Sequence, residues 1–252
     1  MRAGVRLFAA VLRMSLRNRQ GLFWTLFFPV LFMLAASLFS ARPAFAEEGS
    51  SGATYLEFAL SGLIGVTIMN ASLAAIGMGL TTWREKGILK RLRATPLTPA
   101  ALLGGLVANQ VLIGAVSVAL MLLLAVAAFG ARVHLDLGPL TALVLAGLVV
   151  FLALGFFLSG LARRPESVPP LVNLIALPMM LLSGVFFPME SLPHWVQAAA
   201  GILPLTFLVD GLRDVMSAGA GWPDIARHLA GLGAWAAATV VAAIRTFRWD
   251  GG

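Results

Sequence analysis

The side chains that most often carry chemistry in proteins are scarce in this sequence and far apart. The chain has no cysteine, which excludes disulfides, thiolate metal sites and cysteine nucleophiles. Its three histidines are His134, His194 and His228, and their spacing is not that of metal ligands. The apolar stretches carry no convergent His, Asp, Glu or Ser constellation for acid–base or nucleophilic catalysis. The sequence therefore predicts neither a catalytic site nor a metal centre.

One short segment, residues 84–93, is densely charged. On a helix, its apolar residues Ile88, Leu89 and Leu92 form a stripe about 100° wide, and charged side chains cover most of the rest. The nearby Pro96 ends the helix, because the residue before a proline disfavours the helical conformation. We therefore predict a short amphipathic helix made of Arg84, Glu85, Lys86, Ile88, Leu89, Lys90, Arg91, Leu92 and Arg93.

This amphipathic helix has three possible ligands. It could bind anionic lipid, dock its apolar stripe into a groove of a cytoplasmic partner, or bind RNA. RNA is the least favoured, because Trp83 is the only aromatic residue nearby that could stack on bases. A generic basic loop is the alternative to all three.

Polar residues inside the apolar stretches are candidates to line a transport path. We select Thr67, Asn70, Asn109 and Asn173. Each keeps a structural alternative, because hydroxyl and amide side chains in such stretches also hydrogen-bond to neighbouring helices. The stretches carry no ionised residue near their centres, which disfavours a carrier driven by protons or ions.

A second charged group, Asp210, Arg213 and Asp214, lies between the last two apolar stretches. These residues could gate the outer mouth of a path. Their spacing of three and four residues also puts them on one face of a helix, where they could simply pair with each other.

Composition places the chain in a membrane. Of its 252 residues, 60% are hydrophobic and 12% are charged, and the mean hydropathy is +0.92. An average soluble domain has about 25% charged residues. The net charge of +7 does not indicate a nucleic-acid partner, because membrane proteins collect Lys and Arg on their cytoplasmic loops.

Six apolar stretches are long enough to cross a bilayer core, which needs about 20 helical residues. They predict an all-α integral membrane protein that forms one domain over residues 1–252. The fifth stretch is the shortest, and Pro178 in its middle predicts a kink. The stretches are roughly 22–40, 58–80, 100–129, 140–161, 171–187 and 225–244.

The basic residues orient these spans. With both termini in the cytoplasm, 14 of the 18 Lys and Arg residues lie on the inner side. A signal peptide cleaved after Ala46 is the alternative, but its apolar run of about 19 residues exceeds the usual length of about 7 to 15. We therefore expect a multi-pass protein of a prokaryotic cytoplasmic membrane.

Two further regions predict helices that do not cross. Residues 1–20 place four arginines on one helix face and apolar residues opposite, which predicts an amphipathic helix lying in the inner interface. Between spans five and six, Ser191 can cap a short helix that begins at Pro193, and Pro204 starts a second one. Both are too apolar to be free in water, so we expect them to dip into the outer leaflet beside the spans.

The region around the fifth span resembles the type-2 ABC exporter permeases. The resemblance covers the chain as a whole, with six spans and the loop REKGILKRLRATPLTP between spans two and three. The family often has Tyr at the position of Thr206, so no role for that side chain is implied. The matching residues are Leu182-Ser183-Gly184, Phe187-Pro188, Leu192-Pro193, Trp195, Pro204-Leu205-Thr206 and Leu212-Arg213.

The resemblance implies a permease subunit that exports a drug, lipid or glycan. It implies two copies of an ABC ATPase that bind ATP and Mg²⁺, a second permease that is either identical or different, and contact with membrane lipid. The chain itself has no phosphate-binding GxxxxGK[ST] motif and is expected to bind no cofactor. The segment 84–93 would be the coupling helix that docks on the ATPase. An ion-driven carrier and a membrane-embedded lipid-modifying enzyme are the alternatives.

Overall fold

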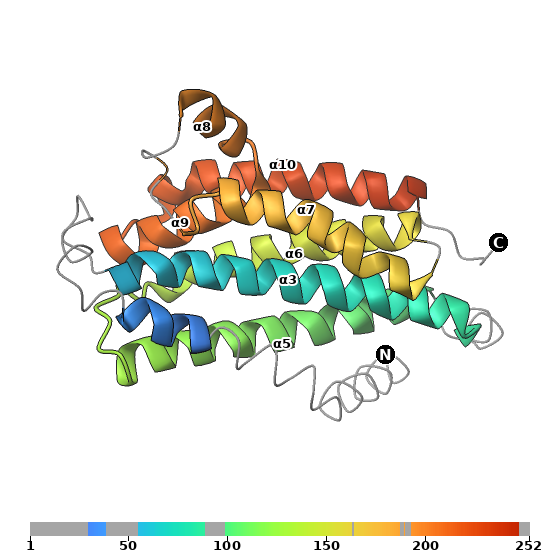
Figure 1. Ribbon diagram of the computed structural model, residues 1–252, viewed down its shortest axis with the longest axis horizontal. Helices are drawn as coiled ribbons and strands as arrows, with labels where there is room; N and C mark the ends of the chain where they lie inside the picture. Colours follow the sequence, from blue (N-terminus) through green and yellow to red (C-terminus); the bar gives the residue numbers. More distant parts are fainter. Residues whose placement is uncertain are drawn as a thin grey trace.

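The computed structural model describes residues 30–38, 55–88, 99–162, 164–186, 189 and 193–246, with the backbone alone over 99–103. Over these residues the chain is a bundle of helices (Figure 1). The helices are residues 30–38, α3 (Tyr55–Glu85), α5 (Pro99–Ala127), α6 (Leu137–Leu161), the 3-10 turn η2 (Pro165–Ser167), α7 (Val168–Leu182), α8 (His194–Ala200), α9 (Pro204–Ala218) and α10 (Trp222–Thr246).

Five of the described helical segments are long and apolar enough to cross a membrane. They are α3, α5, α6, η2 together with α7, and α10. Each corresponds to one predicted span. Residues 30–38 fall within the predicted first span, whose remaining residues lie outside the described ones, as does the predicted interfacial helix 1–20.

The helices are longer than most of the apolar stretches that predicted them. The helix α3 has 31 residues and is about 46 Å long, whereas a bilayer core is about 30 Å thick. Its last turn therefore carries polar residues, including Arg84. The helix α7 instead ends before its predicted span does, at Leu182 and not at residue 187. Two residues later, Gly184 has the left-handed conformation, with a φ of 64°, which is typical of the end of a helix.

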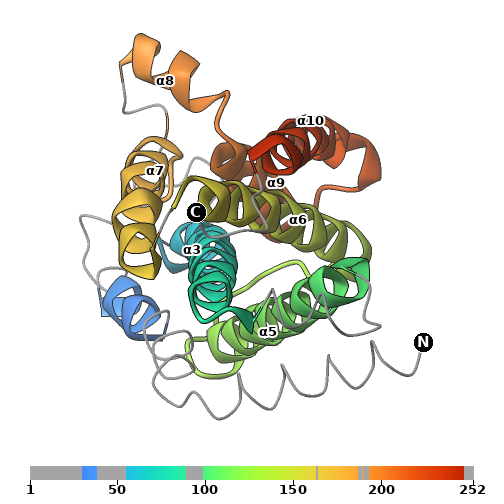
Figure 2. The same ribbon diagram turned by 90° about the vertical axis from the view of Figure 1, so that its right-hand side faces the viewer.

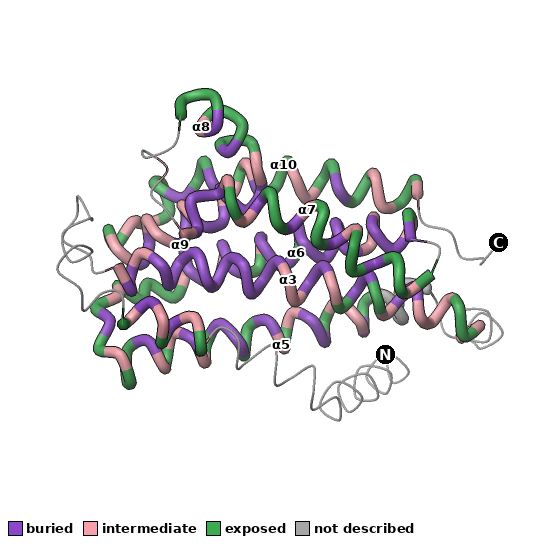
Figure 3. The backbone as a smooth tube through the Cα atoms, viewed as in Figure 1, coloured by how far each residue is buried: buried purple, intermediate pink, exposed green. Residues whose placement is uncertain are grey.

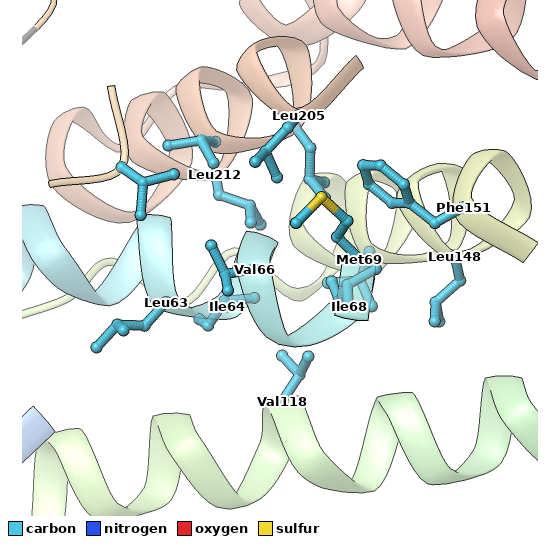
Figure 4. Packing of buried hydrophobic residues seen from close by; sticks show 14 of the residues in the cluster. Leu63, Ile64, Val66, Ile68, Met69, Val118, Leu148, Phe151, Leu205 and Leu212 are labelled. Atoms are coloured by element: carbon cyan, nitrogen blue, oxygen red, sulfur yellow. The ribbon is translucent and has the colours of Figure 1, made fainter. Parts of the chain in front are cut away.

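The helix α3 runs through the centre of the bundle. Viewed end-on, α5, α6, α7 and α9 surround it (Figure 2). Its sequence is apolar on all sides, as a helix enclosed by other helices requires. Figure 4 shows the resulting core, in which Ile64 and Met69 of α3 lie among Val118 of α5, Phe151 of α6 and Leu205 of α9.

Glycines let two backbones approach α3 closely. A Cβ atom at Gly62 would lie 2.7 Å from the carbonyl oxygen of Val185, in the chain just after α7. A Cβ atom at Gly155 of α6 would lie 3.1 Å from the carbonyl oxygen of Ser72. Close approach through small residues is a principal source of helix association in membranes, where apolar burial contributes little.

The two short helices between α7 and α10 have different environments. They meet at a bend of 92°. The first, α8, stands away from the bundle, and its Trp195 is 76% exposed (Figure 3). The second, α9, packs against α3, α6 and α10 and is largely buried. We expected both beside the spans; α9 does pack beside them, with Leu205, Leu208 and Leu212 of its apolar face fully buried, whereas α8 stands apart.

Candidate functional site

The two charged groups predicted from the sequence lie at opposite ends of the bundle (Figure 1). At the Tyr55 end, the N–H of Arg132 donates to Glu57 over 2.7 Å, and the N–H of His134 donates to the carbonyl of Met216 over 2.8 Å. These bonds bring the α5–α6 connection, the start of α3 and the end of α9 together. At the Glu85 end, the end of α6 meets the end of α10, where Gly160 lies beside Thr246.

At the Tyr55 end, Arg213 of α9 links three elements. Its Nη1 lies 3.4 Å from Oδ1 of Asp210, and its Nη2 donates to the carbonyl of Gly184, just after α7, over 2.9 Å. Its guanidinium carbon lies 3.9 Å from the centre of the Phe58 ring in α3, which is a cation–π contact. The arginine side chain is only 21% exposed, so it fastens α9 to α3 and to the end of α7.

Asp214, the third residue of the predicted gate, faces α10 instead. Its Oδ2 lies 3.0 Å from Nε2 of the buried His228 and 3.5 Å from Nη2 of the exposed Arg227. The same Nε2 lies 3.1 Å from Nε of Arg227. Nε2 can donate to the carboxylate only when protonated and accept from Arg227 only when unprotonated, so one of these two bonds forms at a time. The residues of the predicted gate therefore form two separate sets of contacts: Arg213 contacts α3, and Asp214 contacts α10.

The predicted path residues do not all gather at one place. Thr67 is buried, and its hydroxyl donates to the Leu63 carbonyl over 2.7 Å and lies 3.6 Å from the Met121 sulfur. Asn70 is half-buried, Asn109 is buried in α5, and Asn173 is exposed on α7.

Three of these positions lie where α3 and α5 meet, and Thr67 is one of them because Met121 belongs to α5. The amide of Gln110 donates to the carbonyl of Ala71 over 3.1 Å, so Asn70 and Asn109 belong to the stretches where α3 and α5 meet. Asn173 belongs to α7, and α5 and α7 flank α3 on different sides (Figure 2). Within one copy of the chain, Asn173 is therefore not part of the α3–α5 contact.

At the Glu85 end, the structure divides the predicted coupling helix. Arg84 and Glu85 belong to the last turn of α3, and Gly87 has a positive φ of 66°. A left-handed glycine ends a helix, so α3 does not continue past this residue. Ile88 is half-buried, and the remaining predicted members, Leu89, Lys90, Arg91, Leu92 and Arg93, lie outside the described residues.

Two side chains for which the sequence predicted no role hold the bend between α8 and α9. The hydroxyl of Thr206 donates to the carbonyl of Ala200 over 2.7 Å, and Nε1 of Trp235 in α10 donates to the carbonyl of Ile202 over 2.7 Å. A helix broken inside a membrane must have its freed carbonyl groups satisfied by protein. That requirement, applied to the break before Pro204, is the signal that could have identified both residues.

We expect Thr206→Val to loosen this bend. The variant keeps the shape of the buried side chain but removes one of the two donors to the Ala200 carbonyl, which keeps its bond from the Leu203 N–H. The expected loss is therefore that of one hydrogen bond, about 0.5–1.5 kcal/mol. Thermal unfolding of the purified protein in detergent measures the loss. Thr239→Val is the matched control, because the Thr239 hydroxyl bonds to carbonyls within its own helix. Equal losses in the two variants would contradict the assignment of Thr206.

Comparison with known proteins identifies the family. The family model described as ABC-2 type transporter matches residues 5–217. The daunorubicin resistance ABC transporter permease protein DrrB1 of Streptomyces coeruleorubidus is 31% identical over 78% of this chain and 69% of its own length. Nodulation protein J of Rhizobium leguminosarum bv. trifolii is 30% identical over 72% of this chain and 69% of its own.

Two further relatives are more distant. The putative transport permease YvfS of Bacillus subtilis (strain 168) is 24% identical over 86% of both chains. The linearmycin resistance permease protein LnrN of the same organism is 26% identical, and the match spans 43% of its length. The family model covers most of the chain, and several helices are long and apolar enough to cross a membrane. This chain therefore belongs to the ABC-2 type transporter family of membrane permeases.

Proposed function

We propose that this chain is the membrane subunit of an ATP-driven exporter. The match to the ABC-2 type family over residues 5–217 carries the proposal. The subunit works with two copies of an ABC ATPase, which bind ATP and Mg²⁺, and with a second permease. Its substrate is hydrophobic or amphipathic, in keeping with the resistance permeases named after daunorubicin and linearmycin among its relatives.

In this proposal the Glu85 end faces the cytoplasm and the Tyr55 end faces outward. The described part of the Glu85 end carries the basic residues Arg84, Lys86, Arg164 and Arg245. Lys and Arg favour the cytoplasmic side of membrane proteins. Both termini are then cytoplasmic, and the bend between α8 and α9 lies toward the outer side of the membrane.

The transport cycle couples two equilibria. ATP binding closes the ATPase dimer, and the closure moves the cytoplasmic segment after Gly87, which shifts the permease between inward-facing and outward-facing states. Nucleotide can shift that balance only through its different affinity for the two states. On the outward side, release of the Arg213 and Asp214 contacts would let α9 move away from α3 and α10.

Purification of the full chain from its native membranes, without crosslinker, tests the proposed partner. We expect an ABC ATPase to be retained, and we expect transport into inverted vesicles that requires ATP and is stopped by vanadate. Daunorubicin, which names one relative, is the first fluorescent probe. Transport that instead stops with an ionophore and ignores vanadate would favour an ion-driven carrier and contradict the proposal.

We expect Leu89→Asp to uncouple ATP hydrolysis from export. An acid within the predicted apolar stripe would oppose docking on the ATPase, so export should fall at least about tenfold. Export and ATP hydrolysis are measured on the same vesicles, with the amount of permease in the membrane determined by immunoblot. Leu89→Met is the conservative control and should export normally. Normal export by Leu89→Asp would show that this stripe does not dock.

A further inference from the structure

Arg84 is the last residue of α3 whose side chain is fixed within the bundle. It is half-buried, and its guanidinium donates to two backbone carbonyl groups at the end of another helix. Nη1 lies 3.2 Å from the carbonyl oxygen of Ser159, and Nη2 bonds to the carbonyl oxygen of Ala162. The next two residues, Glu85 and Lys86, are exposed.

Those two carbonyl groups belong to the end of α6, which stops at Leu161. The carbonyls of a helix's last turn lack donors from within the helix and carry its partial negative charge. Because Ser159 and Ala162 are 1% and 2% exposed, water has little access to these residues. A guanidinium is well suited to this position, since its planar fork holds several N–H donors in fixed directions.

The end of α6 is also where other helices converge. A Cβ atom at Gly160 would lie 2.8 Å from the carbonyl oxygen of Thr246 at the end of α10. A Cβ atom at Gly77 of α3 would lie 2.8 Å from Cγ1 of Val168, the first residue of α7. A displacement of the end of α6 would therefore act on α10, while α7 is in contact with α3 at Gly77.

Beyond Arg84 the chain turns away from the axis of α3. The N–H of Gly87 donates to the carbonyl of Arg84 over 3.1 Å, and the positive φ of Gly87 ends the helix. A Cβ atom at Gly87 would meet nothing within 4 Å, so the glycine is needed for its conformation and not for space. Arg84 thus occupies the junction between the bundle and the connection that leads to α5.

We propose that Arg84 is a positioning residue that makes the Glu85 ends of α3 and α6 move as one unit. Movement of the connection after Gly87 would reach α6 through the two hydrogen bonds of this guanidinium, not through docking by Arg84 itself. The proposal rests on the proposed function, in which an ATPase moves that connection. The sequence suggested that Arg84 docks on the ATPase. In the structure, both Nη atoms of its guanidinium instead bond to carbonyl groups at the end of α6.

Distance measurement between spin labels tests the link directly. Because the chain has no cysteine, Glu85→Cys and Leu161→Cys give one label on each exposed helix end. In the full chain in lipid nanodiscs, we expect one narrow distance distribution. In Arg84→Ala, the population with separated ends should rise about tenfold, because hydrogen bonds to a charged group stabilise by at least that factor. This measurement needs no ATPase, so its failure is distinct from failure of the proposed function.

Arg164→Ala is the matched control, since it removes the same charge from an exposed side chain at the same end of the bundle. We expect its distances to equal those of the unsubstituted chain. In Arg84→Lys, which has one compact donor group in place of the fork, the separated population should rise by an intermediate factor. If Arg84→Ala fails to fold, this second variant decides, and distances unchanged in Arg84→Lys would overturn the proposal.

The coupling of transport to hydrolysis gives the functional readout. In the complex with its ATPase, Arg84→Ala should transport about tenfold less substrate per ATP hydrolysed, the factor lost with the hydrogen bonds. A merely structural role would lower the amount of folded complex and leave that ratio unchanged. A ratio equal to that of Arg164→Ala would therefore overturn the proposal, whatever the protein yield.

Discussion

Replacement of Gly62 by leucine is expected to prevent α3 from packing against the chain after α7, with a loss of about 3 kcal/mol or more. A Cβ atom there would already lie 2.7 Å from the carbonyl oxygen and 3.0 Å from Cα of Val185. Both are backbone atoms, so the contact can be relieved only by moving a whole segment. Thermal unfolding of the purified protein, together with its yield in the membrane, measures the effect.

Gly79 provides a control on the same helix. A Cβ atom at Gly79 would meet nothing within 4 Å. Gly79→Ala should stabilise α3 by up to about 1 kcal/mol, because glycine is a poor helix former compared with alanine. Gly62→Ala, by contrast, should already destabilise the protein. The same substitution on one helix is thus expected to have opposite signs, and equal effects at the two positions would contradict the packing described here.

Replacement of Arg213 by alanine is expected to release α9 from α3 and from the end of α7. The variant removes the donor to the Gly184 carbonyl and the cation over Phe58. It also leaves Asp210 without its paired charge in a partly enclosed site. Removal of one partner of a buried ion pair costs about 3–5 kcal/mol when the other charge remains. Because this pair is partly exposed, at 21% and 35% of its side chains, we expect about 2 kcal/mol or more.

The measurement for Arg213→Ala is thermal unfolding, with limited proteolysis of the segment between α7 and α9 as a local readout. Arg227→Ala is the matched control, because Arg227 also pairs with an aspartate of α9 but is 74% exposed. Exposed ion pairs contribute about 1 kcal/mol or less. If the two variants unfold at the same temperature, the contacts of Arg213 do not anchor α9.

These variants concern parts of the fold that the sequence predicted to different degrees. The apolar stretches located five spans, because a bilayer requires a long apolar helix whatever packs around it. Their ends were less accurate, because hydropathy marks where a helix enters lipid and not where its hydrogen bonds stop. The helix α3 extends from 55 to 85, past the predicted 58–80, and its additional residues include Arg84.

The candidate site was likewise predicted from the sequence only in part. The sequence correctly placed Asp210, Arg213 and Asp214 on one short helix, since a spacing of three and four residues determines a shared face. It could not show that Arg213 faces Phe58 and Gly184 while Asp214 faces His228. Those partners come from α3, the end of α7 and α10, so their identity depends on how the helices are arranged around α9.

Hydropathy, charge bias and motif spacing are local properties, so they were enough to predict a membrane protein, the approximate positions of five candidate spans and the family. The packing of α9 within the bundle, the bonds of Thr206 and Trp235 at its bend, and the bonds of Arg84 to the end of α6 could be found only from the arrangement of the helices in space. Arg84 and Ser159 are 75 residues apart in the chain. A hydrogen bond over that separation is set by packing, since only packing brings a donor on one helix to the carbonyl groups left open at the end of another.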